Sequence, residues 1–212
     1  LSETIPAEYN GTFAEVSTKA KRSGGFVMTG HTTKAIAAQG TKTDVAVTLE
    51  RTVAKIAVQA STTAEFSERY SGKVRINSVV LSKAASRSNL IAQQTPNTGP
   101  MTFTHTQAAD ELSGKFRNLF YVPENGELAE GSRLLLTLGA TYDRDGNFST
   151  TDDQAEVTYP VELSGDGAGR FLRNGYYRVQ ALIDGLTGSE LSVSISVADW
   201  ETPVTQSVNL GQ

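Results

Sequence analysis

The sequence contains no cysteine, two histidines (His31 and His105) and one tryptophan (Trp200). The absence of cysteine excludes disulfides, a thiol nucleophile and zinc–thiolate sites in these residues. Two histidines are too few for a typical metal cluster or proton relay, and neither has a recognisable catalytic partner in the sequence. We therefore expect both histidines to be surface or edge residues, and we predict no metal site and no cofactor.

Long apolar runs and clustered positive charge are missing too. No stretch approaches the roughly 20 apolar residues of a transmembrane helix. The first residues, Leu1 to Thr4, do not begin a signal peptide, so we expect a processed or trimmed product. The 19 basic and 23 acidic side chains give a net charge of −4, which argues against nucleic-acid binding.

Motifs of the common enzyme classes are also absent. The chain has no G-x-S-x-G nucleophile elbow, no phosphate-binding glycine loop and no H-E-x-x-H motif. The glycine-rich segment Gly165–Gly169 is not followed by a helix-like segment, so we predict a turn there. Asp152 and Asp153 are adjacent, and in a strand they would point to opposite faces, which prevents them from flanking one glycosidic bond. We predict that the protein is not an enzyme.

One acidic segment invites comparison with a calcium loop. Asp143, Asp145 and Asn147 match the first three ligand positions of an EF-hand. Phe148 stands where that loop needs glycine, and Gln154 stands where it needs a bidentate glutamate. We therefore interpret the segment as an exposed hairpin tip, with an Asp-Gly turn between two alternating strands.

The hydrophobic pattern predicts strands along most of the chain. In the segment 191–197, apolar residues alternate with three serines, which indicates a half-buried strand. Similar patterns predict strands over 44–49, 53–60, 73–81, 132–142, 155–163, 176–183 and 203–210, with a further strand ending in a turn over 120–125. Helical patterns are confined to 7–21, which contains an Asn-Gly break, and to one turn over 64–70.

Many short strands separated by glycine, asparagine, aspartate and proline are typical of β-sandwiches. We therefore predict an all-β fold with few short helices. The polar stretch Gln107–Lys115, preceded by a Pro/Asn/Gly-rich segment, suggests a domain boundary near 107–117. The predicted domains are residues 1–114 and residues 115–212, each of ordinary domain size.

Four parts of the chain resemble segments of one protein family, in the family's order. The most specific is Val47–Val58, which contains the run Glu-Arg-Thr-Val-Ala-Lys-Ile. The others are Phe26–Gly30, Phe120–Asn125, and Leu172–Val179 with Val197–Trp200 and Val208–Gln212. On these residues the chain resembles the Bacteroidales fimbrillins, the subunits of type V pili.

The resemblance implies two β-sandwich domains of transthyretin-like, Greek-key topology, in a protein of the Gram-negative outer-membrane surface. It also implies export as a lipoprotein and removal of an N-terminal segment by an arginine-specific protease. This sequence lacks the lipid-bearing cysteine and the expected first strand, so any lipid anchor lies outside this stretch. The basic residues Lys21 and Arg22 are a candidate cleavage site, the alternative being an exposed loop that is not processed.

In the family, loss of the first strand opens a groove that the C-terminal strand of the next subunit fills. The matching donor segment here begins at Pro203, and Val204, Val208 and Leu210 share one face with Gln206 as the weak position. The alternative is that this strand pairs within its own domain. The resemblance thus implies neighbouring pilus subunits as partners and is compatible with a host or bacterial surface receptor.

A second hypothesis keeps the architecture but assigns the chain to surface adhesins or glycan-binding lipoproteins that do not polymerise. In that case Trp200 or Tyr142 would contact carbohydrate. The alternative for Trp200 is a buried anchor at the end of the strand over 191–197.

Overall fold

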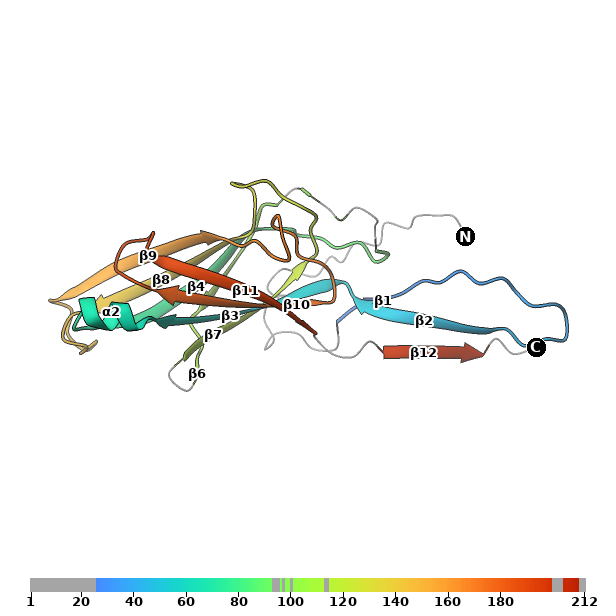
Figure 1. Cartoon of the computed structure of the whole chain (residues 1–212), viewed down its shortest axis with the longest axis horizontal. Coiled ribbons are helices and arrows are strands. Elements are labelled where there is room, and N and C mark those ends of the chain that lie inside the picture. The colour runs from blue at the N-terminus through green and yellow to red at the C-terminus, as the bar shows by residue number, and fades with distance from the viewer. Residues whose placement is uncertain are drawn as a thin grey trace.

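The computed structural model describes residues 26–92, 96, 98–99, 101–112, 115–199 and 204–209. In this part of the chain the molecule is elongated, with a β-sandwich at one end and a narrow arm at the other (Figure 1). The elements are β1 (Met28–Thr29), β2 (Asp44–Arg51), β3 (Val53–Thr62), α2 (Ala64–Arg69), β4 (Lys73–Ala84), β5 (Phe103–Ala108), β6 (Glu111–Leu112), β7 (Lys115–Pro123), β8 (Leu135–Asp143), β9 (Gln154–Glu162), β10 (Gly175–Ile183), β11 (Leu191–Asp199) and β12 (Val204–Asn209).

Two sheets form the sandwich. The five-stranded sheet has the order β11-β10-β3-β7-β6 and the four-stranded sheet has the order β5-β4-β8-β9. Strand β10 runs parallel to β3, whereas the other pairs are antiparallel. Alternate residues of each strand point into one hydrophobic core between the sheets, in which Ile56, Phe120, Leu138, Tyr159 and Tyr177 are almost fully buried.

The predicted all-β fold and its strands are confirmed. Each strand predicted within the described residues is present with ends shifted by a few residues, and the serines of β11 are exposed as the alternation indicated. The predicted turn over 64–70 is α2, capped by the Thr63 hydroxyl, which accepts from the backbone N–H of Phe66 at 3.2 Å. The helical pattern over 7–21 lies outside the described residues. No described helix is long and apolar enough to cross a lipid bilayer.

The expected division at residue 114 does not fit the described part of the chain. Strand β3 pairs with β7 and β10, and β4 pairs with β8, so strands from both predicted domains lie side by side in both sheets. Ile56 and Phe120, for example, are register partners and belong to the same core. The described residues of the stretch over 107–117 belong to β5, β6 and β7 and to the turn between β5 and β6.

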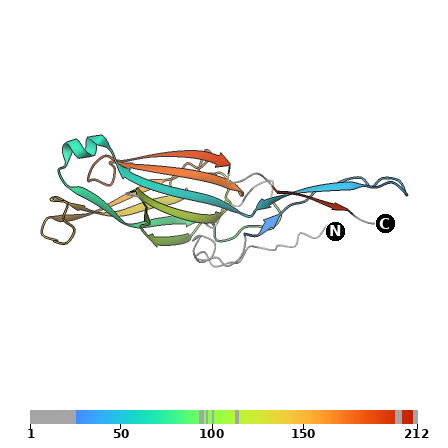
Figure 2. The same ribbon diagram turned by 90° about the horizontal axis from the view of Figure 1, so that it is seen from below.

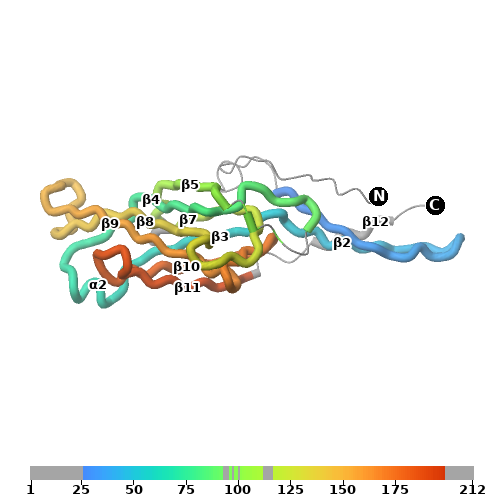
Figure 3. The backbone as a smooth tube through the Cα atoms, turned by 90° about the horizontal axis from the view of Figure 1, so that it is seen from above, coloured from blue at the N-terminus to red at the C-terminus, as the bar shows by residue number. Residues whose placement is uncertain are grey.

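The arm consists of a separate three-stranded sheet with the order β1-β2-β12. Strand β2 runs from the far end of the arm toward the sandwich and is joined to β3 through the single residue Thr52. Figure 2 shows the same arm from below, and the tube in Figure 3 shows residues 30–43 turning at its far end before β2 returns. Along β2, Val45, Val47 and Leu49 are only half-buried, which contrasts with the fully buried inward face of β3.

Candidate functional site at the base of the arm

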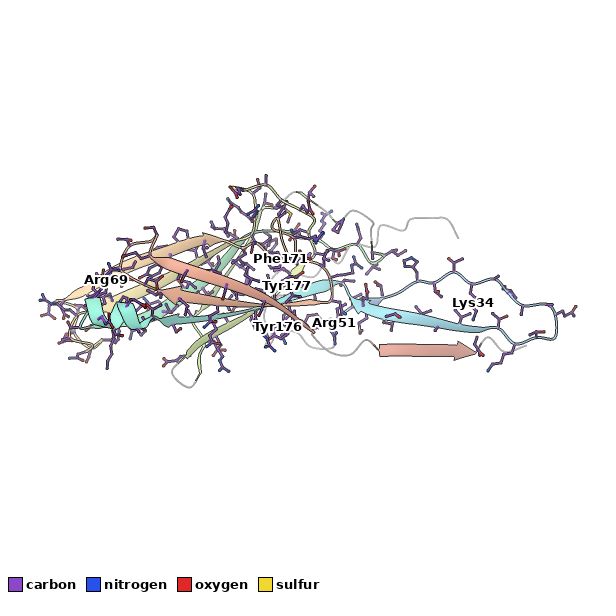
Figure 4. All side chains as sticks on the ribbon, in the orientation of Figure 1. Lys34, Arg51, Arg69, Phe171, Tyr176 and Tyr177 are labelled. Atoms are coloured by element: carbon purple, nitrogen blue, oxygen red, sulfur yellow. The ribbon has the colours of Figure 1, made fainter. Side chains whose placement is uncertain are left out.

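Three segments that lie far apart in the sequence meet where β2 joins β3. They are the end of β2, the turn after β7, and the turn before β10. The side chain of Asn174 accepts hydrogen bonds from Arg51, with 3.0 Å between Nη1 and Oδ1, and its backbone N–H donates to the carbonyl of Val53 at 2.9 Å. Figure 4 shows Arg51, Phe171, Tyr176 and Tyr177 gathered in this region. The three segments are among those on which the family resemblance rests.

A buried ion pair connects two of these segments. Nη2 of Arg173 lies 2.5 Å from Oε1 of Glu124, and both side chains are buried. The same guanidinium donates to the carbonyl oxygens of Asn89 at 2.7 Å and Leu90 at 3.1 Å. Arg173 therefore fixes the turn before β10, the end of β7 and the loop after β4 at one point, and these acceptors offset part of the loss of its hydration.

Asn125 fixes the same turn from the other side. Its backbone N–H donates to the carbonyl of Phe171 at 2.9 Å, and its fully buried amide donates to the carbonyls of Gly126 and Gly169, each at 2.8 Å. Phe171 packs on Tyr177, with ring centroids 4.6 Å apart. The glycine-rich segment is a turn, as the sequence predicted. Gly165 adopts a φ of +60°, and a side chain there would collide with the Arg170 carbonyl.

Thr52, between β2 and β3, is held on both sides. Its backbone N–H donates to the carbonyl of Val27 at 3.1 Å, and its own carbonyl accepts from the hydroxyl of Ser88 at 2.6 Å. Beside it, Phe26 packs on Tyr121 with ring centroids 4.4 Å apart. Burial raises the pKa of Tyr121, because the charged phenolate is disfavoured away from water. The base of the arm is thus a fixed joint rather than an open loop.

Strand β12 pairs with β2 and forms the edge of the arm sheet. Its register partners on β2 run from Val204 opposite Leu49 to Asn209 opposite Asp44. On the other edge of β2, β1 pairs only with Glu50 and Arg51 within the described residues. Gly30 lies against Thr48 beyond that point, where a side chain would collide with the Thr48 carbonyl. The β2 edge beyond Glu50 therefore carries no strand among the described residues.

The structure places some of the residues that the sequence singled out. Val204, Gln206 and Val208 lie in β12 as register partners of Leu49, Val47 and Val45. Pro203, Leu210, Lys21, Arg22 and Trp200 lie outside the described residues. Within this structure β12 pairs with β2 of its own chain.

Tyr142 and the two histidines, which the sequence analysis also discussed, lie within the described residues. Tyr142 is a core residue whose hydroxyl accepts from the backbone N–H of Gly72 at 3.3 Å, so its ring is not an exposed platform for carbohydrate. His31 is exposed, as expected. His105 lies on the edge strand β5 and packs edge-on against Phe120, with ring centroids 5.6 Å apart.

The acidic hairpin between β8 and β9 is tighter than the sequence suggested. One carboxylate oxygen from each of Asp143, Asp145 and Asp153 lies within 4.8 Å of the others, a spacing that a divalent cation would fit. Asp143 is fully buried rather than exposed. Its oxygens accept hydrogen bonds from the Asn147 backbone N–H and the Gln154 amide, each at 2.9 Å. Two donors of the hairpin itself thus already bind the Asp143 carboxylate.

The two coupled carboxyls of this hairpin shift in opposite directions. Burial alone would raise the pKa of Asp143, but hydrogen bonds from Gln154, Asp145 and the backbone outweigh burial and lower it. The backbone N–H of Asn147 favours ionised Asp145, but the shared hydrogen bond with Asp143, partial burial and the nearby negative charges raise the pKa of Asp145. Of the two, Asp145 is therefore the group that takes up a proton first as the pH falls.

Comparison with known proteins gives matches among solved structures only. No family model and no curated protein matches the chain. A candidate cell adhesion protein from Bacteroides eggerthii matches with a TM-score of 0.50 and 15% identity, over 73% of this chain and 57% of that one. The chain shares the fold of that protein. The all-β sandwich inferred from sequence is therefore also the fold of that candidate cell adhesion protein.

Two further solved structures match over a similar share of the chain. A second candidate cell adhesion protein, from Parabacteroides distasonis, has a TM-score of 0.48 and 15% identity, over 73% of this chain and 60% of that one. A fimbrilin, FimA of Porphyromonas gingivalis, has a TM-score of 0.46 and 17% identity, over 72% and 59% respectively. The chain spans less than two thirds of the length of each of these proteins.

Proposed function

We propose that the protein is a structural subunit of a cell-surface pilus and that it polymerises by exchanging β12 between neighbouring copies. The observation that carries the proposal is the position of β12. It is the last strand of the described chain, it lies at the edge of its sheet, and its neighbour in that sheet is β2 rather than a strand of the sandwich. Release of β12 therefore leaves both sandwich sheets intact.

Exchange conserves the hydrogen bonds of the strand. When β12 leaves its own β2 and pairs with β2 of the next subunit, the same six register pairs form between two chains instead of within one. A freed β2 edge exposes unpaired N–H and C=O groups, which favours recapture of a strand. In the proposed exchange each subunit gives its β12 to one neighbour and receives that of another, so the contact is head-to-tail and builds a filament, whereas reciprocal exchange between two chains would close a dimer.

Cysteine cross-linking between two separate chains tests this exchange directly, because residues 1–212 contain no cysteine. One variant carries Thr48→Cys and the other carries Thr205→Cys, at positions that are register partners. Mixed under polymerising conditions and oxidised, the two variants should give a disulfide-linked heterodimer. Asp44→Cys with Thr205→Cys is the mismatched control, because Asp44 pairs with Asn209 instead. Cross-linking of both pairs to the same extent, or of neither, would exclude the exchange.

Removal of the donor strand is the complementary test. A chain that ends at residue 202 should remain a folded monomer with the circular dichroism of the full chain and should form no polymers. Fibres of normal length from this truncated chain, seen by electron microscopy, would contradict the proposal.

The cell-surface location and maturation belong to the same proposal. We propose that the subunit reaches the outer-membrane surface as a lipoprotein and is cleaved after Arg22 by an arginine-specific protease. N-terminal sequencing after digestion should give a new terminus at Ser23, and Arg22→Ala should abolish it. Cleavage elsewhere in the native protein would argue against this processing site.

A further inference from the structure

The outer face of the five-stranded sheet holds a polar recess of about 550 Å³. Its floor is formed by the outward-facing residues of β3, β7, β10 and β11. The register places Ala57 between Arg178 of β10 and Leu119 of β7, and it places Ser196 on the far side of Arg178. At the next outward-facing position of β3, Gln59 lies between Gln180 and Arg117.

Residue size explains the hollow. Ala57 and the two β11 serines, Ser194 and Ser196, are short, whereas Arg117 and Arg178 are long. On a sheet, outward side chains of neighbouring strands stand side by side, so short residues leave a depression that the long ones border. The inward partners in these strands belong to the packed core, so the depression is on the surface only.

The recess carries positive charge although the chain as a whole is acidic. Lys55, Arg117 and Arg178 line it, against one carboxylate, that of Asp110. The Tyr176 ring lies 4.4 Å from Nζ of Lys55 and 5.1 Å from Cζ of Arg178, so one ring orients two cations. Neither Arg117 nor Arg178 forms an ion pair with any residue that the structure describes. The guanidinium groups of these two arginines, without carboxylate partners among the described residues, favour an anionic ligand.

The rest of the lining indicates what kind of anion fits. Gln59, Gln180, Ser194 and Ser196 offer neutral amides and hydroxyls, which suit the hydroxyl groups of a sugar. A peptide strand has no place to add in the recess, because β3 and β10 are internal strands whose backbone groups are paired on both sides. We propose that this recess binds an anionic oligosaccharide whose carboxylate or sulfate groups contact Lys55, Arg117 and Arg178.

Binding to the full chain can be measured by isothermal titration calorimetry with three hexasaccharides: hyaluronan for carboxylate, a heparin fragment for sulfate, and neutral maltohexaose. At least one acidic hexasaccharide should bind saturably and maltohexaose should not. Binding of hyaluronan shows that carboxylates suffice, whereas binding of the heparin fragment alone shows that sulfate is required. Absence of binding by both acidic sugars, or equal binding of the neutral sugar, would overturn the proposal.

Two variants separate a shaped site from general electrostatic attraction. Arg178→Ala should weaken binding by about tenfold or more, because it removes a charged hydrogen-bond donor. Ala57→Met should also abolish most of the binding, since it fills the hollow without changing any charge. Arg75→Ala is the matched control, because Arg75 lies over Phe148, away from the recess. Unchanged binding in the folded Ala57→Met variant, or equal loss in Arg75→Ala, would show that no shaped site exists.

A hexaglutamate peptide supplies the remaining comparison. If it competes with the acidic sugar at equal concentration, the ligand class is an acidic peptide and the saccharide proposal is wrong. None of these variants lies in β2 or β12, so loss of sugar binding and loss of polymerisation are separate outcomes.

Discussion

Nη2 of Arg173 lies 2.5 Å from Oε1 of Glu124, and the two side chains are only 5% and 8% exposed. The pair joins the turn before β10 to the end of β7, beside the point where the arm leaves the sandwich. A buried ion pair contributes little net free energy when it is intact, but removal of one partner leaves an unpaired buried charge. The base of the arm is therefore sensitive to any substitution that breaks this pair.

Glu124→Ala should lower the free energy of unfolding by about 3–5 kcal/mol, because Arg173 would remain buried without its carboxylate. Urea unfolding followed by circular dichroism measures this loss. Glu127→Ala is the control, since Glu127 is largely exposed and its contact with Arg170 is 3.5 Å long. It should change the stability by less than about 1 kcal/mol. Similar losses in both variants would show that the buried pair has no special role.

Asn174 should tolerate glycine better than alanine. Its φ of 58° lies in the left-handed region, and its side chain accepts from Arg51. Asn174→Ala loses that acceptor and adds strain of about 1–2 kcal/mol, whereas Asn174→Gly loses the acceptor alone. Denaturant midpoints should therefore follow the order wild type, glycine variant, alanine variant. An alanine variant as stable as the glycine variant would contradict the backbone argument.

The arm and the sandwich should differ in their sensitivity to the same substitution. Val58→Ala opens a cavity in the core, where Val58 is 3% exposed, and should cost about 1–3 kcal/mol of unfolding free energy. Val47→Ala on β2 removes the same atoms from a half-buried site and should cost distinctly less. Thermal unfolding of both variants gives the comparison. Equal losses would show that the difference in burial between the two sites does not set the cost.

The stability of the protein should fall in alkaline solution because of Tyr159. This residue is fully buried, and its hydroxyl donates to the Gly185 carbonyl at 2.8 Å. Burial, with smaller effects of Glu190 and Tyr70, raises the pKa of Tyr159 to about 12 from its ordinary value of 10.0. The unfolded chain ionises first, so the stabilisation is complete below pH 10 and is lost as the pH rises towards 12. The loss from this group amounts to about 2–3 kcal/mol.

Tyr159→Phe tests this dependence. The variant should lose about 1 kcal/mol at neutral pH, because the Gly185 carbonyl loses its donor. Between pH 10 and 12 its stability should fall less steeply than that of the natural chain, as measured by urea midpoints at each pH. Some slope should remain, because burial also raises the pKa of Tyr177. An unchanged slope would show that Tyr159 does not control the alkaline transition.

Local sequence patterns predicted the strands well because most of them have one buried and one exposed face. The seven-residue alternation of β11 is the plainest case. Strand β5 was not predicted, because its segment, Phe-Thr-His-Thr-Gln-Ala, has few apolar residues at an edge of the sheet. The domain boundary predicted at residue 114 also rested on polar residues close to this segment. Asn118 is polar yet buried, and it is satisfied by Gln107 and Ala108 rather than by water.

The candidate sites depended on contacts that no local pattern contains. Arg173 and Glu124 are 49 residues apart, and Asn174 and Arg51 are 123 apart. The resemblance to fimbrillins marked all three segments of the joint, but only the sheet register shows that they meet. The charged recess likewise could not be predicted from the sequence, since Lys55 and Tyr176 become neighbours only when β10 pairs with β3.

The single residue between β2 and β3 has a mechanical consequence. Figures 1 and 2 show these two strands following the long axis one after the other, so tension on the arm travels along the chain directly into β3. Strand β3 is bonded to β10 on one side and to β7 on the other, over eight register pairs each. The pull runs nearly parallel to the strands and across their hydrogen bonds, so these bonds are loaded in shear, all at once, instead of being opened one after another.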